Sequence, residues 1–199
     1  MRIRQSILDA AAVAICALAW GTTWFTITLQ LGVVDPVVSL VYRFTLASLV
    51  LGLWALMRRE PVRLTWPQHA AAAGVGLFMF AADYAFTYAA ELRIVSGLVA
   101  LIFATLAFVN LVIFRALLGK RAPQHAWVAA AVGVAGVVLL SWSEIVQSRI
   151  DSGTVFGVAL AFGAVLLSGI GNVFAYRGEA LGRRWQHRPH GRWPMAHWR

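Results

Sequence analysis

The sequence predicts an all-α protein, a polytopic membrane helix bundle of six transmembrane helices with both ends in the cytoplasm. Of its 199 residues, 60% are hydrophobic and only 13% are charged, about half the charge of a typical soluble domain. The apolar residues form six runs close to the roughly 20 residues that cross a bilayer as a helix. Basic residues gather in alternate connections between these runs, a pattern typical of membrane proteins.

The six apolar runs are continuous, and this continuity predicts helices rather than the alternating strands of a membrane barrel. A helix also satisfies its backbone polar groups internally, as the hydrocarbon interior requires. Within the runs, the sequence has only two charged residues, Arg43 and Asp83. The predicted spans are Ala10–Leu29, Val37–Met57, Ala70–Ala90, Ile94–Phe114, Ala126–Ser143 and Thr154–Tyr176.

The distribution of basic residues predicts the orientation. One side of the membrane would hold Arg2, Arg4, Arg58, Arg59, Arg63, Arg115, Lys120, Arg121 and Arg177. The other side would hold only Arg93 and Arg149, together with Asp35, Glu91, Glu144 and Asp151. The positive-inside bias places the first group in the cytoplasm. Because the net charge of +9 falls between membrane spans, we expect a lipid bilayer as partner and no nucleic acid.

A weak internal repeat predicts the domain organisation. At an offset of 148 residues, Ala11 aligns with Ala159, Leu18 with Leu166 and Gly21 with Gly169. A repeat of five helices would place the second copy upside down, which is the usual construction of secondary transporters. We therefore expect a five-helix repeat over residues 7–143 and the first helix of an incomplete second repeat over residues 154–176.

The last segment, residues 183–199, differs in composition from the rest of the chain. It contains five Arg, three His, three Trp and two Pro, and no Leu, Ile or Val. This composition predicts disorder in water. One interpretation is a basic and aromatic segment that lies on anionic headgroups. The other, which we favour, is that the natural reading frame was lost near Leu181, so that the tail is frame-shifted.

Several strings along the first five spans resemble one transporter family. They are Ala19-Trp20-Gly21-Thr22-Thr23-Trp24-Phe25, Pro36, Tyr42-Arg43-Phe44-Thr45-Leu46-Ala47, Tyr84-Ala85-Phe86 and Ile94-Val95-Ser96-Gly97-Leu98-Val99-Ala100-Leu101-Ile102-Phe103-Ala104-Thr105. Together they are similar to EamA-type members of the drug/metabolite transporter superfamily. The resemblance covers about Ala10 to Ser143.

The resemblance implies ten helices in two inverted five-helix repeats and the export of small metabolites such as amino acids by alternating access. Two features depart from the family. Leu106-Ala107-Phe108 stands where members often have a proline, and four of the ten helices are missing, as if the chain were truncated after the sixth. The alternatives are therefore an inactive fragment, a non-transporting subunit that requires dimerisation, for example as a homodimer, and a membrane-embedded enzyme.

The two charges inside the spans are the first candidates for function, because a charge at mid-bilayer costs roughly 2.5–3.5 kcal/mol on insertion scales. Arg43 follows Pro36 by seven residues and Asp83 precedes Ala90 by seven, which places both about 10 Å below the outer surface. We expect them to form an ion pair. The pair could have a structural role alone, or Asp83 could couple transport to protons.

Four further residues are candidates for a substrate pathway. Trp20 would lie near mid-membrane and Tyr84 below the outer interface, where aromatic rings can line a path or pack between helices. Thr23 and Thr105 need partners in hydrocarbon, so we expect hydrogen bonds between helices. The sequence contains no motif for catalysis, for a metal or for a cofactor, so we expect no enzyme, and a small molecule as substrate.

Overall fold

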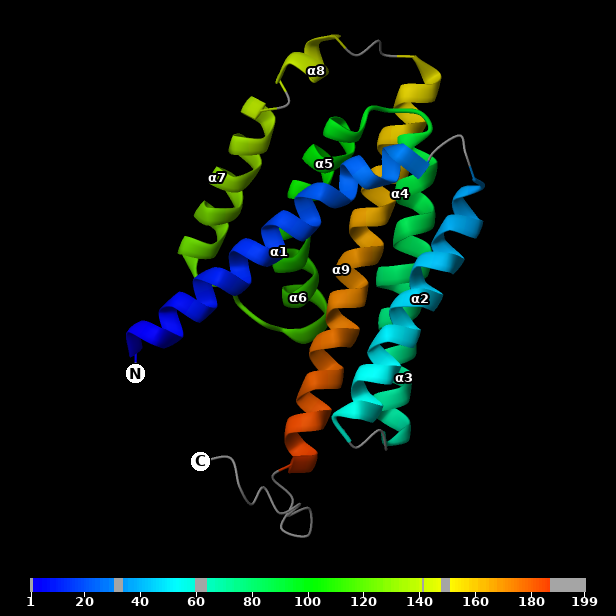
Figure 1. Cartoon of the computed structure of the whole chain (residues 1–199). Coiled ribbons are helices and arrows are strands. Elements are labelled where there is room, and N and C mark those ends of the chain that lie inside the picture. The colour runs from blue at the N-terminus through cyan, green and yellow to red at the C-terminus, as the bar shows by residue number, and fades with distance from the viewer. Residues whose placement is uncertain (1, 31–33, 60–63, 141, 148–150, 187–199) are drawn as a thin grey trace.

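The computed structural model describes residues 2–30, 34–59, 64–140, 142–147 and 151–186, and every element within them is helical. In chain order (Figure 1), these elements are α1 (Arg2–Gln30), α2 (Pro36–Met57), α3 (Trp66–Val75), the π-helix η1 (Gly76–Ala82), α4 (Asp83–Glu91), α5 (Ser96–Ala104), α6 (Leu106–Leu118), α7 (Gln124–Leu140), α8 (Trp142–Gln147) and α9 (Ser152–Gln186).

The all-helical fold and its apolar helices confirm the predicted fold class. Five helical stretches in the described part are long and apolar enough to span a membrane: Asp9–Ile27, Val37–Met57, Trp66–Glu91, Ser96–Leu118 and Ser152–Gly182. The fifth predicted span corresponds to a shorter apolar helix, Gln124–Leu139. The third stretch joins α3, η1 and α4, and the fourth joins α5 and α6. The orientation with both ends in the cytoplasm stays a prediction.

Carboxylate caps begin two of these helices. Asp35 accepts a hydrogen bond from the backbone N–H of Val37 at 2.8 Å and so caps α2. Asp151 accepts one from the N–H of Thr154 at 2.7 Å at the start of α9. The N–H of Thr154 stabilises the charged carboxylate and so lowers the pKa of Asp151. These caps satisfy N–H groups that a helix leaves without an internal partner.

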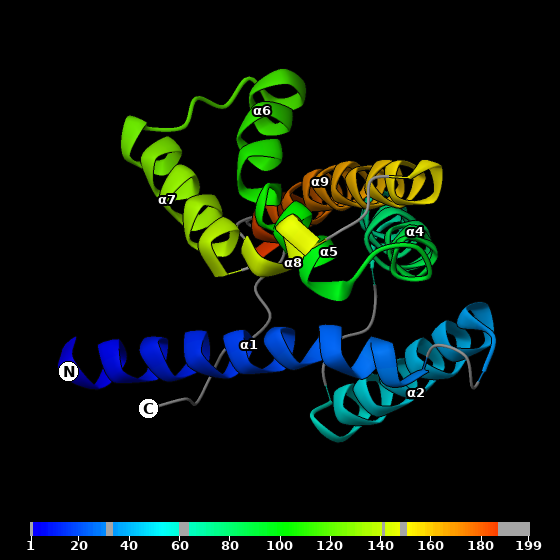
Figure 2. The ribbon, with the colours of Figure 1, turned by 90° about the horizontal axis from the view of Figure 1, so that it is seen from above.

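Helix α9 lies at the centre of the bundle, where it contacts α3, η1, α4, α5 and α6. Figure 1 shows α9 running alongside α3 and α4. In Figure 2, α4 is seen end-on while α1 is seen along its whole length, so α1 is steeply inclined to α4. Side chains such as Val13 and Leu18 on α1 are 69% and 70% exposed. Such exposed apolar surface suits contact with lipid or further helices.

Small residues form the face of α9 that packs in this bundle. Gly157, Ala161, Ala164, Ser168 and Gly171 are all buried, and they recur at alternating spacings of four and three residues. That spacing is the heptad pattern that keeps one side of a helix against its neighbours. Small residues there allow backbones to approach closely, which drives helix packing in membranes.

The contacts of this face follow a regular antiparallel register. From the end of α9 towards its start, Gly178 lies against Ala71, Gly171 against Met79, Gly163 against Phe86, and Gly157 against Arg93 and Ile94. Residues earlier in α9 therefore contact residues later in the segment formed by α3, η1, α4 and the turn after α4, so the two segments are antiparallel. This register places the middle of α9, near Ser168, opposite the start of α4.

Helix α9 extends beyond the predicted sixth span. The prediction ends that span at Tyr176, whereas α9 ends at Gln186. The expected disorder is therefore wrong for Arg183–Gln186, because a helix can continue past the bilayer once its buried face has docked. Residues 187–199 of the predicted tail lie outside the described residues.

Candidate functional site

The π-helix η1 sets the direction of Asp83. The N–H of Asp83 bonds to the carbonyl of Phe78, five residues earlier, as in a π-turn rather than an α-turn. A π-turn inserts one extra residue, which rotates the following side chains by roughly 100° around the helix axis. As a result, α4 begins with Asp83 on the face that meets α9.

Asp83 is buried between α4 and α9, with 5% of its surface exposed. Its Oδ2 accepts a hydrogen bond from the Ser168 hydroxyl at 2.6 Å, and its Oδ1 accepts one from the Thr87 hydroxyl at 3.4 Å. Thr87 and Ser168 are 2% and 3% exposed. Asp83 and Thr87 lie one helical turn apart and share a face of α4. Two hydroxyl donors, one from each helix, therefore hold a carboxyl group inside the bundle.

The expected ion pair between Arg43 and Asp83 is wrong. Arg43 donates from Nη2 to the Tyr84 hydroxyl at 3.5 Å, and its guanidinium carbon lies 4.8 Å from the centre of the Tyr84 ring. Consecutive residues on a helix point about 100° apart. Tyr84 therefore points towards α2 and Arg43, while Asp83 points towards α9.

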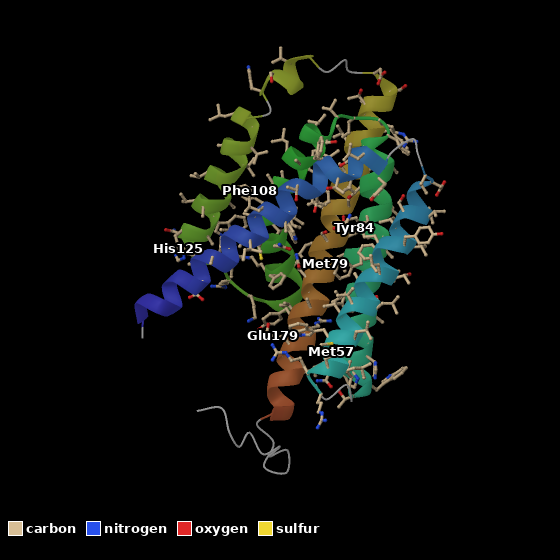
Figure 3. All side chains as sticks on the ribbon, in the orientation of Figure 1. Met57, Met79, Tyr84, Phe108, His125 and Glu179 are labelled. Carbon is tan, nitrogen blue, oxygen red and sulfur yellow. The ribbon has the colours of Figure 1, made fainter. Side chains whose placement is uncertain are left out.

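Aromatic rings surround Arg43 on the α2 side of α4. The rings of Phe44 and Tyr84 meet edge to face with centroids 5.2 Å apart, and Phe44 meets Phe80 in the same way at 5.4 Å. Figure 3 shows Tyr84 where α2 passes α4. The negative face of an aromatic ring attracts a cation, so Tyr84 stabilises Arg43 within an apolar surrounding. Arg43 therefore contacts Tyr84, a partner that the sequence did not predict.

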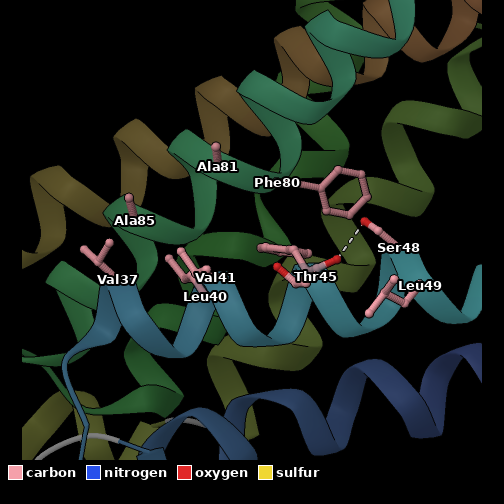
Figure 4. A pocket seen from close by; sticks show the side chains of 10 residues that line it. Val37, Leu40, Val41, Thr45, Ser48, Leu49, Phe80, Ala81 and Ala85 are labelled. Atoms are coloured by element: carbon pink, nitrogen blue, oxygen red, sulfur yellow. Dashed lines mark hydrogen bonds between the residues drawn. The ribbon is translucent and has the colours of Figure 1, made fainter.

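Next to this aromatic cluster lies a cavity of about 630 Å³, which we call the α2 groove. Figure 4 shows α2 facing η1 and α4 across it. Its lining is Val37, Leu40, Val41, Phe44, Thr45, Ser48, Leu49, Phe80, Ala81 and Ala85. The Ser48 hydroxyl donates to the Phe44 carbonyl at 2.7 Å. Because none of the lining side chains is charged, the groove suits a lipid acyl chain better than a polar metabolite.

A second cavity, which has charged and amide side chains in its lining, lies between α6 and α9. This α6–α9 hollow measures about 470 Å³ and is lined by Asn110, Leu111, Phe114, Lys120, Arg121, Ala122, Asn172, Ala175, Tyr176 and Glu179. The Asn172 amide donates to the Asn110 side-chain oxygen at 3.1 Å. The Lys120 ammonium lies 4.2 Å from the centre of the Tyr176 ring. The hollow therefore presents both signs of charge, amides and an aromatic face.

Three predicted site residues are not brought to Asp83. The Trp20 side chain is 69% exposed on α1. The Thr23 hydroxyl donates to the Ala19 carbonyl at 2.9 Å, and the Thr105 hydroxyl to the Ile102 carbonyl at 2.6 Å. The expected bonds between helices are therefore wrong for both threonines, because a hydroxyl can return to a carbonyl of the preceding turn. Thr105 instead marks the junction of α5 and α6.

Two residues of the site, Ser168 and Glu91, were not predicted from the sequence. Ser168 looked like one more small residue, and only its place in the heptad pattern of α9 indicates that it faces the bundle. Glu91 was assigned to an outer connection, but it ends α4 and is 9% exposed. Asp83, Thr87 and Glu91 are spaced by four residues, a signal for one shared helix face.

Comparison with known proteins identifies the family. The profile of the EamA-like transporter family matches residues 9–142, which is more than half of the chain. The chain belongs to the EamA-like transporter family. Three curated relatives, each named "Uncharacterized inner membrane transporter YedA" and each from a strain of Escherichia coli, are 30% identical to it over 142 residues. No solved structure matches the chain.

The match to this EamA-like family confirms the resemblance seen in the sequence strings. The aligned region covers 71% of the chain but 46% of each Escherichia coli relative, so the chain spans about half the length of the curated relatives it matches. Membership and the apolar helices make this a multi-pass membrane protein of a transporter family rather than of an enzyme family. The described residues contain no group of three metal-ligating side chains.

Proposed function

We propose that this chain acts in a secondary transporter that exports small metabolites, such as amino acids, across the inner membrane of a bacterium by alternating access. Family membership supports transport, and the relatives are named as inner membrane transporters. The α6–α9 hollow supports the substrate class, since Lys120 and Glu179 both line it. A site with both signs of charge suits a zwitterion. A mechanism in which two repeats move against each other would also explain why α9 packs against α3, η1, α4, α5 and α6.

The observation that carries the proposal is the buried carboxyl group of Asp83. It joins α4, in the first predicted repeat, to Ser168 on α9, in the second. Any motion of α9 relative to α4 must break or remake this hydrogen bond. An ionised carboxyl accepts only, whereas a protonated one can also donate. Gain and loss of a proton at Asp83 would therefore change which arrangement of the two helices is stable, and so couple transport to protons.

A test of this proposal uses the purified chain in proteoliposomes with a mixture of radiolabelled amino acids and an imposed pH gradient. The unmodified chain is expected to show flux that depends on the gradient. Asp83→Asn should reduce the gradient-dependent part by tenfold or more, because the amide cannot exchange a proton. Asp35→Asn is the matched control, since asparagine caps a helix as well as aspartate. Equal gradient dependence in Asp83→Asn and the unmodified chain would refute the coupling role.

A second candidate is a subunit that transports only as a homodimer. The chain spans about half the length of its curated relatives, and α1 and α2 expose apolar side chains such as Leu18, Trp20 and Leu51. In the same proteoliposomes, flux per chain that increases with the density of protein in the membrane would favour the homodimer. A complete lack of flux at every density would favour an inactive fragment.

A further inference from the structure

Glu91 is a buried carboxylate for which the described structure provides no hydrogen-bond partner. It is the last residue of α4, and only the short turn Leu92–Val95 separates it from α5. Both carboxylate oxygens are buried, and neither makes a hydrogen bond within the described residues. The C-terminal end of a helix carries a partial negative charge. An ionised carboxylate in this place would therefore be disfavoured both by burial and by the helix.

The two described cations near this end of the bundle, Arg93 and Arg43, make their contacts elsewhere. Arg93 donates from Nη1 to the Ala89 carbonyl at 2.6 Å, and its guanidinium carbon lies 5.0 Å from the centre of the Phe156 ring. Arg43 contacts Tyr84 on the other face of α4. Other titratable or hydroxyl groups on the packed elements include Asp83, Thr87 and Tyr88 on α4, Ser96 on α5, and Ser152 and Thr154 at the start of α9, with Asp151 before it.

The surroundings of Glu91 fit a proton better than a metal ion. A hollow of about 460 Å³, the Glu91 hollow, is lined by Glu91, Arg93, Ile94, Val95 and Ser96. Calcium and magnesium require about six or more oxygen ligands, and one carboxylate with one serine hydroxyl supplies far fewer. A proton needs no further ligands, and it removes the charge that burial disfavours.

Glu91 shares one face of α4 with Asp83. Thr87 lies midway between them, one helical turn from each, with a rise of about 6 Å for each four-residue step. Its hydroxyl already donates to Asp83, and it is 2% exposed. Three oxygen-bearing side chains therefore follow one another along the buried face of this helix, from the Glu91 hollow to the contact with α9.

We propose that Glu91 takes up a proton from the Glu91 hollow and passes it through Thr87 to Asp83. The Glu91 side chain, which makes no hydrogen bond within the described residues, first turns towards the Thr87 hydroxyl one helical turn earlier. Its O–H bond then breaks as the proton bonds to the Thr87 hydroxyl oxygen, while Thr87 gives its own proton to Asp83. Glu91 returns to the carboxylate, Thr87 stays neutral after its hydroxyl rotates back, and Asp83 gains one proton. This inference rests on the proton-coupled transport proposed above, and it assigns the entry site and the intermediate group.

The first experiment tests the protonation of Glu91 without transport. Infrared difference spectra of the purified protein, recorded between two pH values, should contain the carbonyl stretch of a protonated carboxylic acid. Glu91→Gln should remove this band, Glu91→Asp should shift it, and Asp35→Asn should leave it unchanged. The Asp variant keeps the test valid if the Gln variant does not fold. An unchanged band in both Glu91 variants would overturn the inference, whatever the transport assay shows.

The second experiment tests the relay with a pH-sensitive dye enclosed in proteoliposomes. Thr87→Val and Glu91→Gln should each slow proton entry at least tenfold, while Thr87→Ser should restore the rate, because serine keeps the hydroxyl. A purely structural Thr87 would instead be rescued by the isosteric valine and not by serine. Failure of the unmodified chain to move protons would refute the proposed function. Normal proton entry in Thr87→Val would refute the relay alone.

Discussion

Replacing Gly171 with alanine is expected to lower the free energy of unfolding by about 1–3 kcal/mol, the usual effect of overpacking. A Cβ at this position would lie 2.7 Å from the Met79 Cβ, 3.1 Å from its backbone N and 3.2 Å from its Cα. Because two of these atoms are backbone, a change of rotamer cannot relieve the clash. Helix α9 would have to move away from η1, which would disturb the contact at Asp83 as well.

The matched control is Gly136→Ala on α7, where nothing lies within 4 Å of an added Cβ. Alanine favours a helix over glycine by about 1 kcal/mol, so this variant should be as stable as the unmodified protein or more stable. Unfolding in mixed detergent micelles, followed by circular dichroism, measures both. Equal effects of the two substitutions would contradict the close packing of α9 on η1.

The second large effect is expected at the hydrogen bond between Ser168 and Asp83. A hydrogen bond to a charged group contributes about 1.5–3 kcal/mol, and Ser168→Ala should destabilise the protein by that amount. The change would leave Asp83 with only the 3.4 Å bond from Thr87. In the double variant with Asp83→Ala, the loss should be smaller than the sum of the two single losses, by a similar coupling energy.

Ser48→Ala is the control for this cycle, since the Ser48 hydroxyl is exposed and bonds to a carbonyl of its own helix. Its effect on the free energy of unfolding should be close to zero. If the losses at Ser168 and Asp83 simply add, then the bond seen between α4 and α9 does not stabilise the protein. The unfolding curves of all these variants can be recorded in the same mixed detergent micelles as those of Gly171→Ala.

The sequence predicted the spans and the buried acid because both depend on local properties. A run of apolar side chains predicts a membrane helix from length and composition alone, and a charge such as Asp83 is conspicuous in that run. The partner of Asp83 could not be predicted in this way. The depth of Asp83 in the membrane follows from its residue number. The direction of its side chain around the helix axis depends on the π-helix η1, which the sequence did not reveal, so the expected pairing with Arg43 was wrong.

Other features depend on packing that no local pattern contains. Ser168 has the size of its glycine and alanine neighbours, so hydropathy did not distinguish it as a hydrogen-bond donor. Glu91 stood at the end of an apolar run, where a solvated acid is the ordinary expectation. The end of α9 at Gln186 was not predicted either, since hydropathy falls before the helix ends. For Thr23 and Thr105 a local contact replaced the expected contact between helices, because each hydroxyl donates to a carbonyl of the preceding turn.

The register of α9 against α3, η1 and α4 is tested most directly by cysteine cross-linking in a Cys16→Ser background. A Cβ at Gly178 would lie 3.4 Å from the Ala71 Cβ, close to the 3.5–4.5 Å that disulfides require. Ala71→Cys with Gly178→Cys should therefore cross-link on mild oxidation in the membrane, whereas Ala71→Cys with Gly157→Cys should not. Cross-linking of the second pair and not the first would contradict the antiparallel packing that places Ser168 on Asp83.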